Sequence, residues 1–262
     1  MNIRILGCHG SDQMVTREAT SISCRPCTFL VNDTVLVDAG TIGSKLTLVE
    51  QLNIRHILLS HLHFDHVKDL PTLADNLAGA SKTPVVIASI AHVLEGLQTH
   101  VFNWAVYPDF FELPSAERPV LSRHMLRSGN RSVLSGLSVT PIAVNHAVPT
   151  VGFIISDGES AFLYSGDTYE TEEIWRVAAT VPELKAAFIE TSYPDEQADL
   201  ARQSKHLTPS LLAGELRKIG RPDLQVYVYH MKPRFRDQIR KQVEAAGMAR
   251  VTLLEEDQKL TV

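Results

Sequence analysis

Residues 61–66 read H-L-H-F-D-H and place three histidines and one aspartate in six positions. The whole chain has only 11 histidines in 262 residues, so this concentration is unusual. The apolar residues 57–59 just before it are typical of a buried strand, and residues 67–74 after it are typical of a helix. The cluster is therefore expected on a strand-to-helix loop, where a rigid scaffold directs side chains at one point.

The residue types and their spacing predict a metal site. Imidazole and carboxylate groups together suit zinc, iron or manganese. His61 and His63 are two residues apart, so on an extended segment they point the same way. Asp65 and His66 follow where the chain turns into the helix, so they face a neighbouring point. Two metals roughly 3.5–4 Å apart could hold a bridging hydroxide and bind a phosphoryl or acyl oxygen. The alternative is a polar loop that happens to contain histidines.

Length and composition favour one globular domain over residues 1–262. A chain of this length fits one large domain or two small ones, but no Pro/Gly/Ser-rich linker, charge block or repeat divides it. Hydrophobic residues make up 44% and charged residues 21%, which are ordinary globular values. The net charge of −5 argues against a general nucleic-acid-binding surface, although not against a local basic patch.

The sequence also predicts a cytoplasmic protein. Its first residues form a strand pattern without the charged and apolar segments of a secretion signal. No apolar run approaches the ~20 residues of a membrane-spanning helix, so no membrane partner is expected. Three cysteines without a secretion signal fit a reducing compartment. Cys24 and Cys27 form a single C-x-x-C pair, expected as buried thiols, with redox or metal chemistry as the alternative.

Strand and helix patterns alternate along the chain, which predicts an α/β fold. Strands are expected at residues 3–8, 28–31, 34–37, 55–60, 84–89, 137–144, 151–156, 161–164, 225–229 and 251–254, and residues 186–193 are expected to be a strand that runs into a loop. Helices are expected at 44–52, 70–80, 90–98, 210–219 and 235–246. The polar residues 7–20 are expected to form a loop that could border a site. The aromatic-rich residues 100–111 are expected to be a packed cap or a substrate-facing loop that stacks on a flat base.

The H-x-H-x-D-H run after an apolar strand resembles the metallo-β-lactamase fold hydrolases. This resemblance implies an αββα sandwich of two mixed β-sheets flanked by helices, a fold that hosts many chemistries. Residues 165–168 (S-G-D-T) also resemble the superfamily, whose bridging carboxylate sits there, and Gly166 is expected to let the backbone come close to the metals. His146, at the end of an expected strand, matches the third histidine of the first metal position.

The resemblance implies two divalent transition-metal ions, with zinc as the first expectation and iron or manganese as alternatives. The first would be bound by His61, His63 and His146, and the second by Asp65, His66 and His230, with Asp167 shared. Taken individually, His146 and Asp167 could instead be polar strand ends. Asp38 is expected either to steady the ligands from behind or to form a turn.

The second half of the chain resembles the class II cyclic-nucleotide phosphodiesterases through residues 190–193 (E-T-S-Y), 206–209 (H-L-T-P) and 230–233 (H-M-K-P). The Glu190 and His206 pair also resembles tRNase Z, a related branch. No stretch resembles the tRNA-binding arm, so a small substrate is expected rather than nucleic acid. The resemblance implies a hydrolase of a small phosphodiester such as 3',5'-cyclic AMP.

The chemistry of a phosphodiester supports this interpretation. Its cleavage needs an in-line nucleophile, neutralisation of charge on the phosphoryl oxygens and a proton for the leaving alkoxide. His206 can donate that proton, and Glu190 can hold its ring and keep it protonated. Together with Asp65 these are the expected catalytic residues, while the alternative for His206 is a structural role at the start of a helix. Lys232 is expected to contact a phosphate or to be a surface lysine.

Three other functions remain open from the sequence. One is hydrolysis of an ester, thioester or lactam, and another is tRNA 3'-end processing. The third is a metal- or nucleotide-binding sensor, or an iron redox protein that uses the same ligands. A homodimer is the assembly considered.

Overall fold

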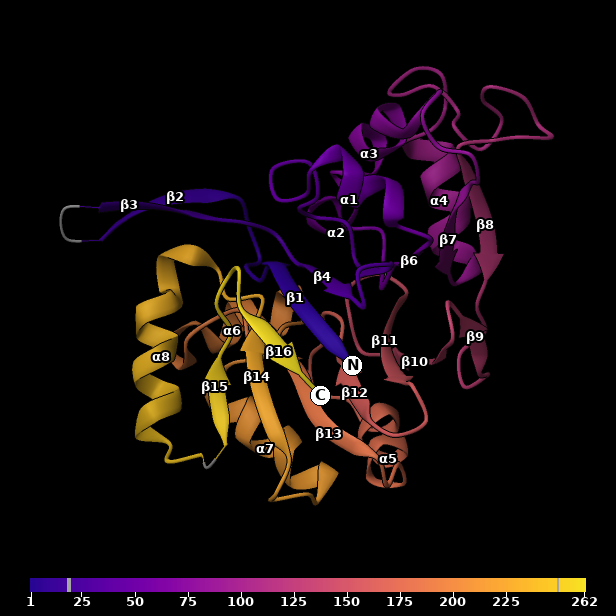
Figure 1. The fold of residues 1–262 in the computed structure, drawn as a ribbon. Helices are drawn as coiled ribbons and strands as arrows, with labels where there is room; N and C mark the ends of the chain where they lie inside the picture. Colours follow the sequence, from indigo (N-terminus) through magenta and orange to yellow (C-terminus); the bar gives the residue numbers. More distant parts are fainter. Residues whose placement is uncertain (18–19, 249) are drawn as a thin grey trace.

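The computed structural model describes residues 1–17, 20–248 and 250–262 (Figure 1). The strands are β1 Asn2–Gly7, β2 Gln13–Arg17, β3 Thr20–Cys24, β4 Thr28–Val31, β5 Val35–Val37, β6 His56–Leu58, β7 Val85–Ser89, β8 Leu121–Met125, β9 Ser132–Leu134, β10 Leu137–Val144, β11 Thr150–Ser156, β12 Ala161–Tyr164, β13 Leu184–Glu190, β14 Gln225–Tyr229, β15 Val251–Leu253 and β16 Lys259–Thr261. The α-helices are α1 Leu48–Asn53, α2 Phe64–Val67, α3 Leu70–Leu77, α4 Ala91–His100, α5 Glu173–Ala179, α6 Ala198–Ser204, α7 Pro209–Ile219 and α8 Arg236–Ala245.

Two seven-stranded sheets form the centre of the fold. The first has the strand order β16-β1-β4-β5-β6-β7-β8, and the second β15-β14-β13-β12-β11-β10-β9. Both sheets are mixed. In the first, β5 to β8 are parallel and the remaining pairs are antiparallel. In the second, β12 to β15 are parallel and β9 to β12 are antiparallel.

A hydrophobic core fills the space between the sheets. Phe29 of β4 is fully buried and contacts rings of Tyr164, Phe188 and Tyr229, which belong to the second sheet. Its centroid lies 5.1 to 5.6 Å from theirs in edge-to-face arrangements, a favourable geometry for aromatic pairs. Phe29 therefore ties the two sheets together next to the ends of their strands.

Helices cover the two outer faces and complete the four-layer αββα sandwich that the family resemblance implies. In α3, Leu70, Leu73 and Leu77 are buried at helical spacing against the first sheet. On the other face, Trp175 of α5 and Leu212 of α7 are buried against the second sheet. Figure 1 shows α1 to α4 grouped beside the first sheet and α5, α7 and α8 beside the second.

Local sequence explains where the helices begin and end. Thr47 accepts from the backbone N–H of Glu50, whose carboxylate accepts from the Thr47 N–H, so a capping box starts α1. Thr208 caps α7, and Pro209 occupies its first turn, where no backbone donor is needed. Gly220 ends α7 with a φ of 66°, a conformation that glycine adopts without steric cost.

The structure corrects part of the expected loop at residues 7–20. β2 and β3 form an antiparallel hairpin in which Gln13 pairs with Cys24 and Val15 with Ile22. Figure 1 shows this hairpin projecting away from both large sheets. Its strands are mostly polar, so they lack the apolar alternation by which a strand is recognised. Strands β8, β9 and β16 and helices α5 and α6 are further elements that the sequence patterns do not predict.

The strand ends converge on one site. The chain leaves β5, β6, β10, β12, β13 and β14 at their carboxyl ends, and each exit carries a polar side chain expected in the site. In open α/β sheets, ligands bind outside these carboxyl ends. Among the described helices, none has the length and hydrophobicity that crossing a bilayer requires.

Candidate metal centre

The structure brings together all the residues that the sequence predicts as metal ligands. Their nitrogen and oxygen atoms form two groups in which the ligand atoms lie within 4.8 Å of one another. The groups are His61, His63 and His146 with Asp167, and Asp65 and His66 with His230. These are the two sets expected for the two metals, and their role as ligands stays a prediction.

Asp167 lies between the two groups. Its Oδ2 atom is 3.3 Å from Nε2 of His230 and 3.4 Å from Nε2 of His66, both in the second group. The same oxygen is 3.7 Å from Nε2 of His61 and 4.0 Å from Nε2 of His146, both in the first. A carboxylate in this position faces both groups at once.

The packing of a neighbouring strand requires glycine at position 166. Gly166 has a φ of 62°, and a Cβ atom there would lie 2.8 Å from the carbonyl oxygen of Val151 on β11. A side chain would therefore collide with the neighbouring strand. The glycine allows the turn after β12 to pack against β11, which places Asp167 in the cluster.

Two unpartnered buried atoms show that the cluster fits a cation. Among the described residues, Nε2 of His61 and Oδ1 of Asp167 are buried and have no hydrogen-bond partner. These side chains are only 0% and 1% exposed, so water does not compensate them from outside. Leaving one such atom unpaired costs about 1–3 kcal/mol. A divalent transition metal, for which imidazole and carboxylate are suitable ligands, would satisfy both.

In four of the histidines, Nδ1 lies at hydrogen-bond distance from a group outside the cluster. The partners of these nitrogens are Ser60 Oγ at 2.9 Å for His61, Asp38 Oδ2 at 2.7 Å for His66, the Lys205 carbonyl at 2.9 Å for His146 and Ser192 Oγ at 2.9 Å for His230. Their Nε2 atoms are left facing the cluster. His63 differs, because the nitrogen that it directs at the cluster is Nδ1, which lies 3.2 Å from Nε2 of His146. Such partners fix the tautomer and orientation of a metal-binding histidine.

The electrostatics of the cluster favour metal binding. Burial and the neighbouring His66 lower the pKa of His61 well below its ordinary value, so its ring is neutral and keeps a lone pair. Burial opposes ionisation of Asp167, but His230 and His66 outweigh it and hold the pKa of that carboxyl well below its usual range. Burial also disfavours a charged His66, yet Asp167 and Asp38 raise its pKa well above the ordinary value. A metal would displace the proton that His66 holds.

Glu190 and His206 form a buried pair beside this cluster. Nδ1 of His206 lies 2.7 Å from Oε1 of Glu190. The His206 ring lies 5.0 Å from that of His146 and is stacked 5.3 Å from that of His230. Burial lowers the pKa of His206, but the Glu190 carboxylate outweighs it and the pKa is raised overall. A His206 nitrogen also lies within 4.8 Å of ligand atoms of Asp167 and His230, so it can either donate a proton or bind metal.

Comparison with known proteins identifies the family. A family model described as "Beta-lactamase superfamily domain" matches residues 33–231. The chain belongs to this superfamily. The resemblance expected from the H-x-H-x-D-H run is thereby confirmed.

Relatives of this beta-lactamase superfamily protein include two with curated names. The "Probable 3',5'-cyclic-nucleotide phosphodiesterase" of Yersinia pestis is 30% identical over 207 residues, covering 70% of this chain and 58% of that protein. The "Ribonuclease Z" of Metallosphaera sedula is 24% identical over 157 residues, covering 58% of this chain and 49% of that protein. The chain therefore spans about half the length of the curated relatives it matches.

A solved structure supports the fold of this superfamily member. The crystal structure of unliganded yeast PDE1 superposes with a TM-score of 0.79 at 19% sequence identity, covering 100% of this chain and 99% of that one. At this identity the likeness establishes the shared fold.

Other residues considered from the sequence take structural positions. Cys24 and Cys27 are buried cysteines, and burial raises the pKa of Cys27 well above its usual range. Phe102 and Phe110 pack into the core, while Trp104 is 62% exposed. Lys232 donates through Nζ to the carbonyl of Gly10. Lys232 is therefore tied to the backbone rather than extended towards solvent.

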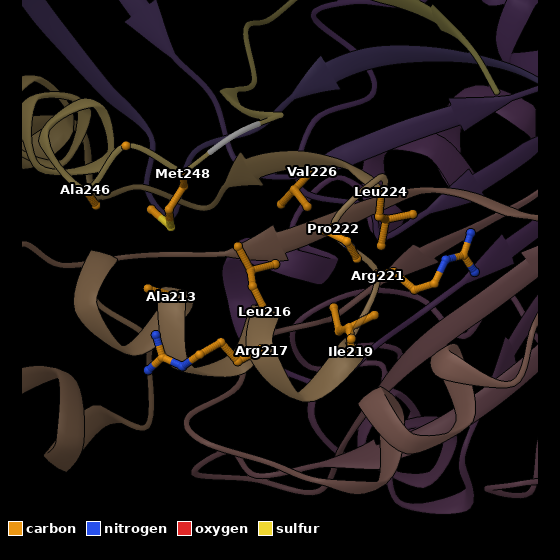
Figure 2. Close-up of a pocket in the computed structure, with 12 residues that line it drawn as sticks. Ala213, Leu216, Arg217, Ile219, Arg221, Pro222, Leu224, Val226, Ala246 and Met248 are labelled. Atoms are coloured by element: carbon orange, nitrogen blue, oxygen red, sulfur yellow. The ribbon is translucent and has the colours of Figure 1, made fainter.

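A separate cavity of about 490 Å³ lies between α7, the start of β14 and the end of α8 (Figure 2). Leu216, Val226 and Met248 line it together with Arg217 and Arg221. It shares no lining residue with the histidine cluster in the described chain, and its aliphatic walls offer no set of metal ligands.

Several residues that shape the site have no sequence pattern that predicts their position. Ser192, Tyr164 and the Lys205 carbonyl lie behind candidate ligands or beside Asp38. Serine, tyrosine and a backbone carbonyl occur throughout any chain, so no pattern distinguishes them. Ser192 belongs to the E-T-S-Y segment at residues 190–193, which indicates a site only through family resemblance.

Proposed function

We propose that this protein binds two divalent transition-metal ions and hydrolyses a small phosphodiester, with a 3',5'-cyclic nucleotide such as cyclic AMP as the first candidate. The observation that carries the proposal is the buried Glu190–His206 pair, joined at 2.7 Å, beside the cluster of histidines and aspartates. The names of the two curated relatives, a cyclic-nucleotide phosphodiesterase and a ribonuclease Z, support phosphodiester chemistry.

In this proposal each group of ligands holds one metal. His61, His63 and His146 would hold the first, Asp65, His66 and His230 the second, and Asp167 would face both. Zinc is the first candidate, because imidazole and carboxylate are among its usual ligands, and iron and manganese are the alternatives. Bound there, the two ions would supply Lewis acidity that neutralises phosphoryl charge and makes water a stronger nucleophile.

The remaining steps belong to the chain's own residues. Glu190 holds His206 through Nδ1, so Nε2 carries the proton that the departing alkoxide needs. Asp65 has a side chain that is 28% exposed, and its Oδ2 lies 3.4 Å from Nε2 of the buried His230. It is thus a ligand at the solvent side of the cluster, where it can accept a hydrogen bond from the attacking water.

A substrate panel combined with metal analysis tests the proposal. Purified protein is assayed with bis-(p-nitrophenyl) phosphate, cyclic AMP, a carboxylic ester, a thioester, a β-lactam and a precursor tRNA. We expect turnover of the small phosphodiesters and a metal content near two per chain. Faster hydrolysis of the ester, thioester or lactam would overturn the substrate class. Turnover of precursor tRNA alone would favour ribonuclease activity, which the relative named Ribonuclease Z supports.

The metal analysis also separates catalysis from sensing. A coloured protein whose absorbance changes on reduction, without turnover of any phosphodiester, would favour an iron redox protein or sensor. A cytoplasmic location and a homodimer complete the proposal. Light scattering of the purified protein and fractionation of cells that express it test these two points.

A further inference from the structure

Ser192 occupies the junction between the candidate metal site and the Glu190–His206 pair. It follows β13 and is fully buried. Its Oγ atom lies 2.9 Å from Nδ1 of His230, 3.1 Å from Oε2 of Glu190 and 3.2 Å from Nδ1 of His206. A single hydroxyl thus contacts a candidate ligand, the candidate proton donor and the carboxylate that orients this donor.

The hydrogen-bonding capacity of each group assigns the direction of these bonds. A hydroxyl has one proton to donate and two lone pairs, whereas an ionised carboxylate only accepts. Two acceptors lie within reach of the Ser192 proton, Oε2 of Glu190 at 3.1 Å and the carbonyl oxygen of His230 at 3.2 Å. The ionised carboxylate is the stronger acceptor, so Ser192 donates to Glu190 and accepts from the N–H at Nδ1 of His230. This leaves a lone pair on Nε2 of His230, which faces Oδ2 of Asp65 at 3.4 Å and Oδ2 of Asp167 at 3.3 Å.

The backbone of Ser192 joins the same two segments. Its N–H donates to the carbonyl of Leu207, next to His206, at 3.1 Å. Its carbonyl accepts from the N–H of Lys232, two residues after His230, at 3.1 Å. Backbone and side chain therefore hold both histidine-bearing loops against the end of β13.

We propose that Ser192 is a positioning residue that couples the second metal position to the proton donor. It does so by fixing the tautomer of His230 and the orientation of Glu190 through one hydroxyl. The inference deepens the proposed function and rests on it for the roles of His206 and His230. The groups behind two other ligands differ from Ser192. Among the described residues, the hydrogen bonds of the Asp38 and Ser60 side chains, which lie behind His66 and His61, do not reach Glu190 or His206.

The test compares Ser192→Ala with Ser89→Ala. Ser89 is also fully buried, and its hydroxyl donates to the carbonyl of Leu59 without contacting a candidate ligand. Stepwise zinc affinities are measured by competition with a chelator. For Ser192→Ala we expect one of the two affinities to fall by about 10–100-fold, because losing a partner behind a ligand typically has this effect. Ser89→Ala is expected to lose stability while keeping both affinities.

Two further readouts separate positioning from a merely structural role. Long-range nitrogen NMR of the zinc-loaded protein reports the tautomer of His230, which we expect to be fixed in the wild type and altered or mixed in Ser192→Ala. Ser192→Thr keeps the hydroxyl, and we expect it to restore the zinc affinity. In steady-state kinetics, Ser192→Ala is expected to lower kcat more than it raises KM.

Different results would overturn the role of Ser192 and the proposed function. Unchanged zinc affinities and an unchanged His230 tautomer in Ser192→Ala would overturn the inference about Ser192, as would an equal loss of zinc affinity in Ser89→Ala. A wild type that binds zinc but cleaves no phosphodiester would instead overturn the proposed function. In that case the affinities and the tautomer of His230 still decide the role of Ser192.

Discussion

Oδ2 of Asp38 lies 2.7 Å from Nδ1 of His66, and both side chains are fully buried. The same oxygen accepts from the hydroxyl of Tyr164 at 2.6 Å, and Ser60 donates to the carboxylate from its N–H at 2.8 Å and its hydroxyl at 2.9 Å. These donors satisfy a buried charge that would otherwise be costly. Because Asp38 accepts a hydrogen bond from the N–H at Nδ1, His66 presents Nε2 to the cluster.

Replacing Asp38 with Asn is expected to weaken metal binding. An amide has only one acceptor oxygen, and its NH₂ group would face one of the donors that now bind the carboxylate. We expect a loss of about 10–100-fold in metal affinity, measured by chelator competition with the metal-free protein. Tyr164→Phe, which removes one donor and keeps the carboxylate, is the matched control and should lose less. Wild-type affinity in Asp38→Asn would show that His66 is not held in this way.

Substituting His206 with Ala is expected to slow cleavage according to the leaving group. Loss of a general acid typically costs about 10²–10⁴-fold in rate. An alkoxide needs the proton more than p-nitrophenolate, so cyclic AMP turnover should fall further than that of bis-(p-nitrophenyl) phosphate. Rates are compared under saturating substrate, and metal content is measured in parallel because His206 also lies within ligand distance of Asp167 and His230.

His92→Ala is the control for this substitution, since His92 is an exposed histidine on α4 and should leave all rates unchanged. Equal losses on both substrates would argue against proton donation by His206. Loss of metal from His206→Ala would assign that histidine to the ligand set instead.

The parts of the site that lie close together in sequence are predictable from the sequence. His61, His63, Asp65 and His66 are adjacent along the chain, and the strand before them and the turn into α2 determine where they point. Strand ends such as those before His146 and Asp167 follow from apolar stretches that stop at polar residues. Even so, only family resemblance connected these distant residues to one site, because spacing along the chain does not report distances across a fold.

The structural features that the sequence does not predict depend on contacts between segments that are distant along the chain. β16 is recognisable only through its pairing with β1, in which Ile3 lies opposite Leu260. Lys205 has a φ of 60°, and this left-handed conformation directs its carbonyl at His146. Neither a lysine nor a three-residue polar strand has a sequence pattern that predicts such a contact.

The salt bridge between Arg4 and Glu50 predicts a pH dependence of stability away from the site. Arg4 and the Thr47 cap lower the pKa of Glu50 to about 2 from an ordinary 4.5. Because the folded pKa lies below the unfolded one, this stabilisation is present above pH 4.5 and disappears as the pH falls towards 2. Glu50→Gln should therefore lower the free energy of unfolding at neutral pH by less than about 1 kcal/mol, since the pair is partly exposed.

Denaturant unfolding of wild type and Glu50→Gln from pH 7 downwards measures this difference. The two curves should converge near pH 2, where Glu50 is becoming neutral like the glutamine. A difference that stays constant over the whole range would mean that the contribution of Glu50 does not depend on its charge.

Gly10→Ala is expected to displace a candidate ligand from a position outside the cluster. A Cβ atom at residue 10 would lie 2.6 Å from the carbonyl oxygen of His230 and 2.8 Å from Nδ1 of its ring. Movement of the ring alone cannot relieve the contact with the carbonyl oxygen. The backbone of His230, which its N–H joins to the Cys8 carbonyl at 2.7 Å, must therefore shift together with the ring. That movement would break the bond to Ser192 and turn Nε2 away from Asp167.

Gly43→Ala provides the control, because a Cβ atom there meets nothing within 4 Å. Chelator competition should show one weakened metal position in Gly10→Ala and none in Gly43→Ala. Cβ contacts as short as those at Gly10 cannot be accommodated without a shift. Retention of both affinities in a folded Gly10→Ala would therefore mean that the loop of residues 8–10 moves instead of His230, and that the metal position does not depend on this packing.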